Sequence, residues 1–164
     1  MNHRPAMWGL GVATILLAAI PNASAQTSKS GFPCQIVGPN ELEPLGDRDG
    51  HALGVTSYSC HADSGPLSGG VWTATAIWEF DGPKATLVTN NGVVRKRGGV
   101  GVYQDTQGTL TLVMANGKPA GWTATGEGHW IMAAGSVADM AGKSYTFAAK
   151  SISPVQFEVE ITPK

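Results

Sequence analysis

The sequence predicts an all-β protein folded as an antiparallel, eight-stranded closed barrel. After residue 20 no segment has sustained helical periodicity, and short alternating runs rich in Val, Thr, Ile and aromatic residues take its place. Gly, Pro, Asn and Asp separate these runs, as turn residues do. An open meander of this length would expose two unpaired strand edges. Closure into a barrel, or folding into two packed layers, would remove most of this exposure, and the pattern favours the barrel.

Eight segments have the strand pattern, and short turns join most of them. They cover residues 51–61, 71–80, 85–89, 93–104, 109–115, 118–130, 144–150 and 155–161. Before them we expect a flexible leader over residues 26–33 and a loop over residues 39–50. The Asn-Asn-Gly sequence at residues 90–92 is the strongest hairpin signal. Gly98-Gly99 indicates a bulge or a bend inside the strand that contains it.

Residues 1–25 have the three parts of a secretory signal peptide. Arg4 lies in a short polar start, the uncharged apolar run 7–20 follows, and an Ala-Ser-Ala triplet ends at Ala25. This run is shorter than the roughly 20 residues that span a bilayer core. We therefore expect cleavage after Ala25, no membrane span in the mature chain, and a secreted or periplasmic location. The barrel domain is expected over residues 34–164.

The two cysteines, Cys34 and Cys60, both lie in the expected mature chain. An even number of cysteines in an exported protein indicates a disulfide. The alternative is a metal site that includes His61, but a single Cys-His step lacks the second closely spaced pair of a zinc motif. His51, His61 and His129 would meet only if distant strands came together, so we predict no metal site.

Composition limits the classes of partner. Charged residues make up 14% of the chain and its formal net charge is −1, so nothing favours nucleic acid or an anionic membrane surface. The chain also has no Gly-x-Ser-x-Gly elbow, phosphate-binding loop or Cys/His nucleophile arrangement. We predict no nucleic-acid partner and no cofactor.

Two of the expected strands share one design. Side chains alternate across a strand, so Trp72 and Trp78 share a face with alanines between them. Trp122 and Trp130 likewise share a face with alanine and glycine between them. Either these tryptophans form a filled core, or they line a cavity for an apolar or aromatic ligand. The interior of an eight-stranded barrel is wide enough for both alternatives.

The opposite faces of the same strands carry three candidates for acid–base catalysis: Glu79, Glu127 and His129. Glu127 and His129 stand at i and i+2 and point the same way, so the carboxylate could orient the imidazole. A solvated surface pair has the same spacing, and that alternative stays open. Catalysis in the barrel needs such a group inside the cavity.

One stretch resembles a known family. Residues 124–130 (ATGEGHW), followed by Ala134-Gly135 and residues 142–147 (GKSYTF), are similar to the glycine-punctuated hairpins of allene oxide cyclase and dirigent-like barrels. The resemblance covers about the last two-thirds of the mature chain. It implies an eight-stranded barrel, often trimeric, whose lumen shapes a reactive hydrophobic guest without metal or organic cofactor. Residues 137–141 lack the aromatic-x-Gly turn of the family, and its catalytic residues do not map onto this chain.

We therefore expect an exported barrel that binds a small hydrophobic or aromatic molecule, and the resemblance adds the expectation of a homo-oligomer. Two other functions stay open. One is a cofactor-free isomerase or cyclase acting in the lumen. The other is an envelope interaction module without a pocket, for which a filled barrel with an exposed apolar patch is the sign.

Overall fold

Successive strands of the protein pair with one another, and the last strand pairs with the first to close a barrel of eight antiparallel strands, as predicted. The structure is a computed structural model that describes residues 30–164. The strands are β1 (Ser30–Pro44), β2 (His51–His61), β3 (Val71–Asp81), β4 (Lys84–Lys96), β5 (Gly99–Ala115), β6 (Lys118–Gly135), β7 (Ser144–Ser153) and β8 (Gln156–Pro163). The predicted signal peptide and the start of the predicted leader lie outside the described residues.

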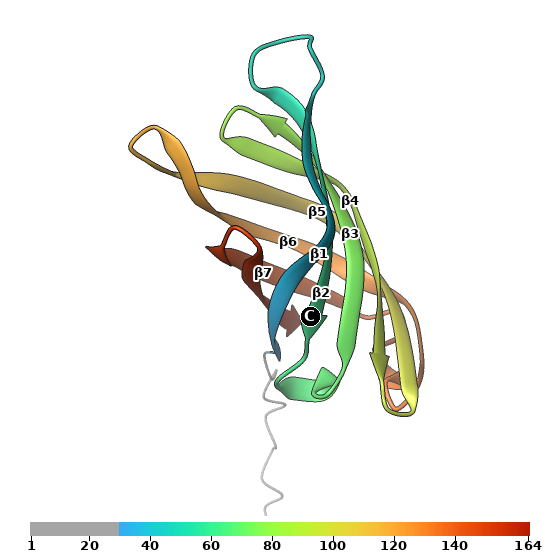
Figure 1. Ribbon diagram of the computed structural model, residues 1–164. Coiled ribbons are helices and arrows are strands. Elements are labelled where there is room, and N and C mark those ends of the chain that lie inside the picture. The colour runs from blue at the N-terminus through green and yellow to red at the C-terminus, as the bar shows by residue number, and fades with distance from the viewer. Residues whose placement is uncertain (1–29) are drawn as a thin grey trace, which may run out of the picture.

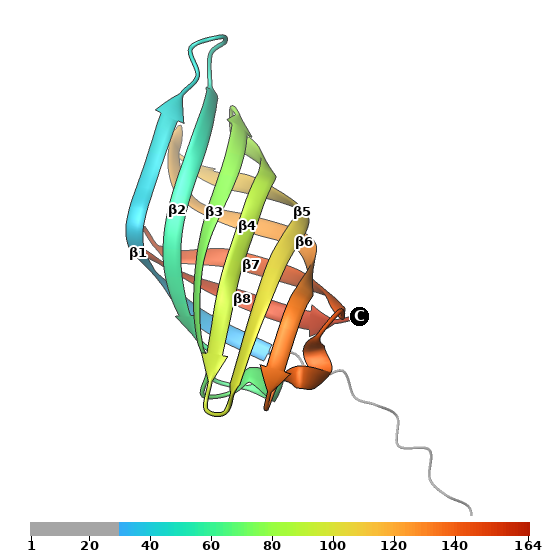
Figure 2. The same cartoon turned by 90° about the vertical axis from the view of Figure 1, so that its right-hand side faces the viewer.

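The connections alternate between two ends of the barrel (Figures 1 and 2). The hairpins β1–β2, β3–β4, β5–β6 and β7–β8 lie at one end, which we call the open end, and the first three of them point upward in Figure 1. The opposite end, which we call the closed end, has the β4–β5 turn and two connections with short 3₁₀ helices, η1 (Gly65–Leu67) and η2 (Ala138–Met140). No helix in the described part of the chain is long and apolar enough to cross a membrane.

Strand β1 is not among the strands that the sequence predicts. Residues 30–33, predicted as leader, pair with β8, and residues 40–44, predicted as loop, pair with β2. The register shifts between Ile36 and Asn40, and this irregularity accommodates Pro39, which cannot donate to a regular ladder. The alternation of a regular strand is broken there, so the hydrophobic pattern of the sequence does not predict β1.

The predicted hairpin at residues 90–92 is wrong. Strand β4 runs through these residues, and the turn falls instead at residues 97–98, where Gly98 has a φ of 74°. Gly98-Gly99 is therefore not a bulge or bend inside one strand, because the chain turns there from β4 to β5. Long-range packing overrides the local turn preference: Gly92 lies against Tyr103, whose ring leaves no space there for a Cβ atom. The predicted segments 85–89, 93–104 and 109–115 form two strands, and β1 restores the total of eight.

The predicted inward faces are confirmed. Trp72 and Ala76 of β3 are buried, and so are Ala124 and Trp130 of β6, while the threonines between them are exposed. The aromatic faces of both strands therefore point into the barrel. The packing of this interior differs between the two ends of the barrel.

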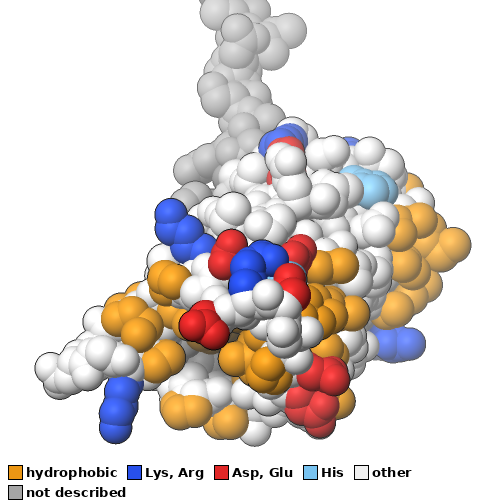
Figure 3. Space-filling model, turned by 90° about the horizontal axis from the view of Figure 1, so that it is seen from above, with side chains coloured by type: hydrophobic (Ala, Val, Ile, Leu, Met, Phe, Trp, Pro, Cys, Tyr) orange, Lys and Arg blue, Asp and Glu red, His pale blue; other side chains and the backbone are white. Residues whose placement is uncertain are grey.

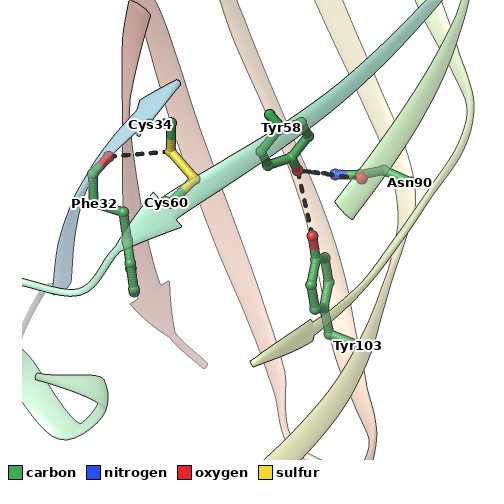
Figure 4. Close-up of a disulfide and its surroundings, with 6 residues drawn as sticks. All are labelled: Phe32, Cys34, Tyr58, Cys60, Asn90 and Tyr103. Atoms are coloured by element: carbon green, nitrogen blue, oxygen red, sulfur yellow. Dashed lines mark hydrogen bonds between the residues drawn. A yellow bond between two sulfur atoms is a disulfide. The ribbon is translucent and has the colours of Figure 1, made fainter. Parts of the chain in front are cut away.

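Cys34 and Cys60 form the predicted disulfide. They are directly paired in the register of β1 and β2, and both side chains are buried (Figure 4). The bond ties the irregular strand β1 to its neighbour. A disulfide is compatible with an oxidising, extracytoplasmic environment.

Candidate functional site

The closed end of the barrel is filled by aromatic side chains. The ring centroid of Trp72 lies 5.0 Å from that of Phe32 and 4.4 Å from that of Tyr103, both in edge-to-face geometry. Tyr103 in turn lies 6.0 Å from Trp130. Trp72 and Trp130 are only 4% and 2% exposed. Such pairs add to the stabilisation that burial of the rings provides, so this end has the properties of a core.

Two apolar side chains from the connections complete the closed end. Leu67 of η1 and Val137, which precedes η2, are 1% and 2% exposed and belong to the same buried cluster as the tryptophans. The main chain supports this arrangement, since the amides of Gly70 and Met140 donate to the carbonyl oxygens of Leu67 and Val137, respectively. The connections therefore act as lids on this end.

The open end holds a cavity of about 570 Å³. Its wall is mostly apolar and includes Trp78, Phe80, Leu110, Trp122, Phe147 and Phe157. Residues beside the β5–β6 and β7–β8 hairpins, among them Pro119 and Pro154, also line it. Figure 3, which looks down from above, shows hydrophobic side chains around a group of acidic and basic ones on this face. The size and character of the cavity match those of small-molecule sites.

The four predicted ligand-binding tryptophans divide between the two ends. Trp72, Trp78 and Trp122 line the cavity, whereas Trp130 is not among its lining residues and packs in the filled core. Trp78 and Trp122 are only partly buried. Of the two alternatives drawn from the sequence, the filled core therefore describes the closed end, and the ligand cavity describes the open end.

A polar cluster forms the base of the cavity. The Tyr145 hydroxyl donates to Asp105 Oδ1 at 2.6 Å, and Asn90 Nδ2 donates to Asp105 Oδ2 at 2.7 Å. Asn90 Nδ2 also donates to the Tyr58 hydroxyl at 2.8 Å, and that hydroxyl lies 3.3 Å from the hydroxyl of Tyr103 (Figure 4). Tyr58, Asn90, Asp105 and Tyr145 all line the cavity, and each comes from a different strand.

Burial controls the ionisation of this cluster. It raises the pKa of Asp105 to about 6, although the hydrogen bonds from Tyr145 and Asn90 oppose the shift. Burial also raises the pKa of Tyr58, Tyr103 and Tyr145 above the ordinary value for a phenol. The phenols therefore stay protonated, and Asp105 is the member of the cluster that titrates near neutral pH.

Two glycines of β6 make room for the cluster and the cavity wall. A Cβ atom at Gly128 would lie 2.6 Å from both Asp105 Oδ1 and the Tyr145 hydroxyl. One at Gly126 would lie 2.7 Å from the Phe147 ring. Both approaches are closer than real Cβ contacts, so the glycine spacing of this strand is required by packing inside the barrel.

The three predicted catalytic residues lie on the outer face of the barrel, and none lines the cavity. Glu79 bonds to His51 at 2.8 Å, and Glu127 contacts Gln107 and Lys164. His129 alternates with the inward Trp130, so it faces outward too. Among the described residues that line the cavity, the side chain with a carboxyl group is that of Asp105.

His51 forms a second polar group, beside the β1–β2 hairpin. Its Nδ1 lies 2.5 Å from Asp47 Oδ1 and its Nε2 lies 2.8 Å from Glu79 Oε1. The hydrogen bond with Asp47 makes the largest contribution to raising the pKa of His51, and the hydrogen bond with Glu79 raises it further. Both ring nitrogens are thus engaged by carboxylates. Among residues 30–164 no group of three His, Cys, Asp or Glu side chains is arranged to hold a metal ion.

Sequence reasoning missed the polar cluster. Asp105 has the same parity as Tyr103, and continuing the alternation two residues beyond Tyr103 would have placed its carboxyl inside the barrel. Asn90 was assigned to a turn. The bonds to Asp105 join residues 15 and 40 positions apart, so no local motif announces them.

These features define the class of protein: a closed antiparallel barrel with a filled end, a mostly apolar cavity at the other end and a buried carboxyl group at the base of that cavity. Comparisons with known proteins found no matching family model, no similar curated protein and no similar solved structure. The resemblance to the allene oxide cyclase and dirigent-like barrels stays a prediction.

Proposed function

We propose that this protein binds a small hydrophobic or aromatic molecule in the cavity at the open end of the barrel. The cavity itself carries the proposal, because its volume of about 570 Å³ falls within the range of small-molecule sites. The partly buried indoles of Trp78 and Trp122 line it. A ligand that covered them would gain about 25 cal/mol for each Å² of apolar surface removed from water.

The disulfide and the predicted signal peptide support a location for this binding. A buried Cys34–Cys60 bridge suits an oxidising compartment. We therefore propose that the protein acts in the periplasm or outside the cell, on a molecule that it meets there.

The test uses two neighbouring alanines of β7. Ala149 lines the cavity, whereas Ala148 is exposed on the outer face. In Ala149→Phe the added ring fills the cavity, so we expect the affinity for 1-naphthylmethanol, measured by calorimetry, to fall by about ten-fold or more. Ala148→Phe is the matched control and should bind like the parent protein. Equal affinities in the two variants, or no binding of naphthyl probes by the parent protein, would refute the proposal.

One observation favours a second candidate function, a cofactor-free isomerase or cyclase. Asp105 brings a carboxyl with a pKa of about 6 to the cavity, and this value suits a general base at neutral pH. Turnover of a bound guest would then be lost in Asp105→Asn while binding persists. The interaction-module alternative has less support, because it expects a filled barrel.

A further inference from the structure

The Asp105 carboxyl group has an unusual charge environment. Asp105 is 6% exposed, and its carboxyl group receives hydrogen bonds from Tyr145 and Asn90, which are neutral donors. Within residues 30–164 the ion pairs of Lys, Arg and His go to other acidic residues and none goes to Asp105. A buried carboxylate without a cation nearby is costly, and a positive charge beside it is strongly favoured.

The hydrogen bonds indicate that Asp105 acts as an acceptor. Both of its oxygens receive a donor, which is the arrangement that an ionised carboxylate requires. An ionised carboxylate can accept about four hydrogen bonds, so two donors leave acceptor capacity. Because Asp105 lines the cavity, a ligand that fills the cavity meets this carboxyl group at its base.

The neighbours of Asp105 add no second charge. Tyr58 of β2, Tyr103 of β5 and Tyr145 of β7 are the titratable groups that face it, and burial keeps these phenols neutral. Asn90 approaches from β4 and Gly128 from β6. The base of the cavity therefore carries one negative charge above about pH 6.

The wall between the base and the mouth also suits a cation. It includes the aromatic rings of Trp78, Trp122 and Phe147. Aromatic faces attract ammonium groups and stabilise them further where water is excluded. Aromatic faces repel anions for the same reason. The aromatic wall and the carboxyl group at the base therefore both favour a cationic ligand over an anionic one.

We propose that the cavity selects hydrophobic or aromatic amines, with the protonated nitrogen bound at Asp105 and the apolar body against the aromatic wall. This inference rests on the proposed binding function and adds the charge of the ligand to it. It requires no chemical step.

The test compares three probes that share one ring system: 1-naphthylmethylamine, 1-naphthylmethanol and 1-naphthoate. Their affinities for the mature protein are measured by calorimetry at about pH 7.5. A charge-assisted hydrogen bond is stronger than a neutral one, so we expect the amine to bind about 10- to 100-fold more tightly than the alcohol. The carboxylate should bind most weakly.

Asp105→Asn keeps the size of the side chain and removes its charge. The amine should then bind no more tightly than the alcohol, and a cooperative urea unfolding transition shows that the variant is folded. An independent measurement needs no variant: between about pH 7.5 and about pH 5 the amine should lose affinity as Asp105 takes up a proton, and the alcohol should not.

Each outcome has a definite meaning. If the alcohol or naphthoate binds the parent protein as tightly as the amine does, the selection of amines is refuted and the proposed binding function stands. If the amine is preferred and Asp105→Asn retains the preference, Asp105 is not its receptor and the inference is also refuted. If no probe binds, the proposed function fails together with the inference.

Discussion

Strands β3 and β6 contribute tryptophans to both ends of the barrel, yet the two ends are packed differently. Strand β3 runs from the closed end to the open end, and β6 runs back, so each strand contributes one tryptophan to each end. Trp72 and Trp130 are almost fully buried at the closed end, whereas Trp78 and Trp122 are partly buried in the cavity wall.

The connections account for this difference. At the closed end, the β2–β3 and β6–β7 connections fold into η1 and η2 and place Leu67 and Val137 in the core. At the open end, the strands are joined by hairpins without 3₁₀ helices, and the β1–β2 and β5–β6 hairpins project away from the barrel (Figures 1 and 2). Strand alternation decides which side chains point inward, and the connections decide whether those side chains are covered.

The largest expected effect tests the comparison directly, with one tryptophan from each end of β6. Trp130→Ala removes a ring from the filled core and should lower the free energy of unfolding by about 3–5 kcal/mol. Trp122→Ala removes a partly exposed ring beside an existing cavity and should cost less than about half as much. Urea unfolding of both variants measures the difference. Equal losses would mean that the two ends are equally packed.

A smaller effect concerns Asp105, at the boundary between the two ends. Its pKa is raised to about 6 from 3.8, so the folded protein binds a proton more tightly than the unfolded chain. The free energy of unfolding should therefore rise as pH falls from about 6 to about 4, by up to about 3 kcal/mol. Urea unfolding as a function of pH measures this gain. In Asp105→Asn the gain should disappear, and its persistence there would assign it to another group.

The smallest effect belongs to His51, beside the β1–β2 hairpin of the open end. Its pKa is raised, so the stability that it contributes is fully present below about pH 6.5 and is lost as pH rises through the folded-state pKa. His51→Gln should lower the melting temperature at about pH 6 and leave it nearly unchanged at about pH 9. A loss of the same size at both pH values would mean that packing, and not charge, holds the hairpin.

Part of the fold could be predicted because it depends on local pattern. The period of two identified the strands and the inward tryptophans, and the pair Cys34 and Cys60 indicated the disulfide. Strand β1 could not be predicted, because Pro39 and the register shift beside it interrupt the alternation of side chains. The turn at residues 90–92 was misplaced because the Tyr103 ring, which comes from another strand, requires Gly92.

The candidate site divides in the same way. The sequence by itself determined which aromatic side chains face the interior, since alternation is a property of a single strand. Only the tertiary structure decided that Trp122 lines a cavity while Trp130 is covered, because coverage depends on connections far away in the chain. It also decided that Asp105 meets Asn90 and Tyr145, since closure of the barrel brings three different strands to one point.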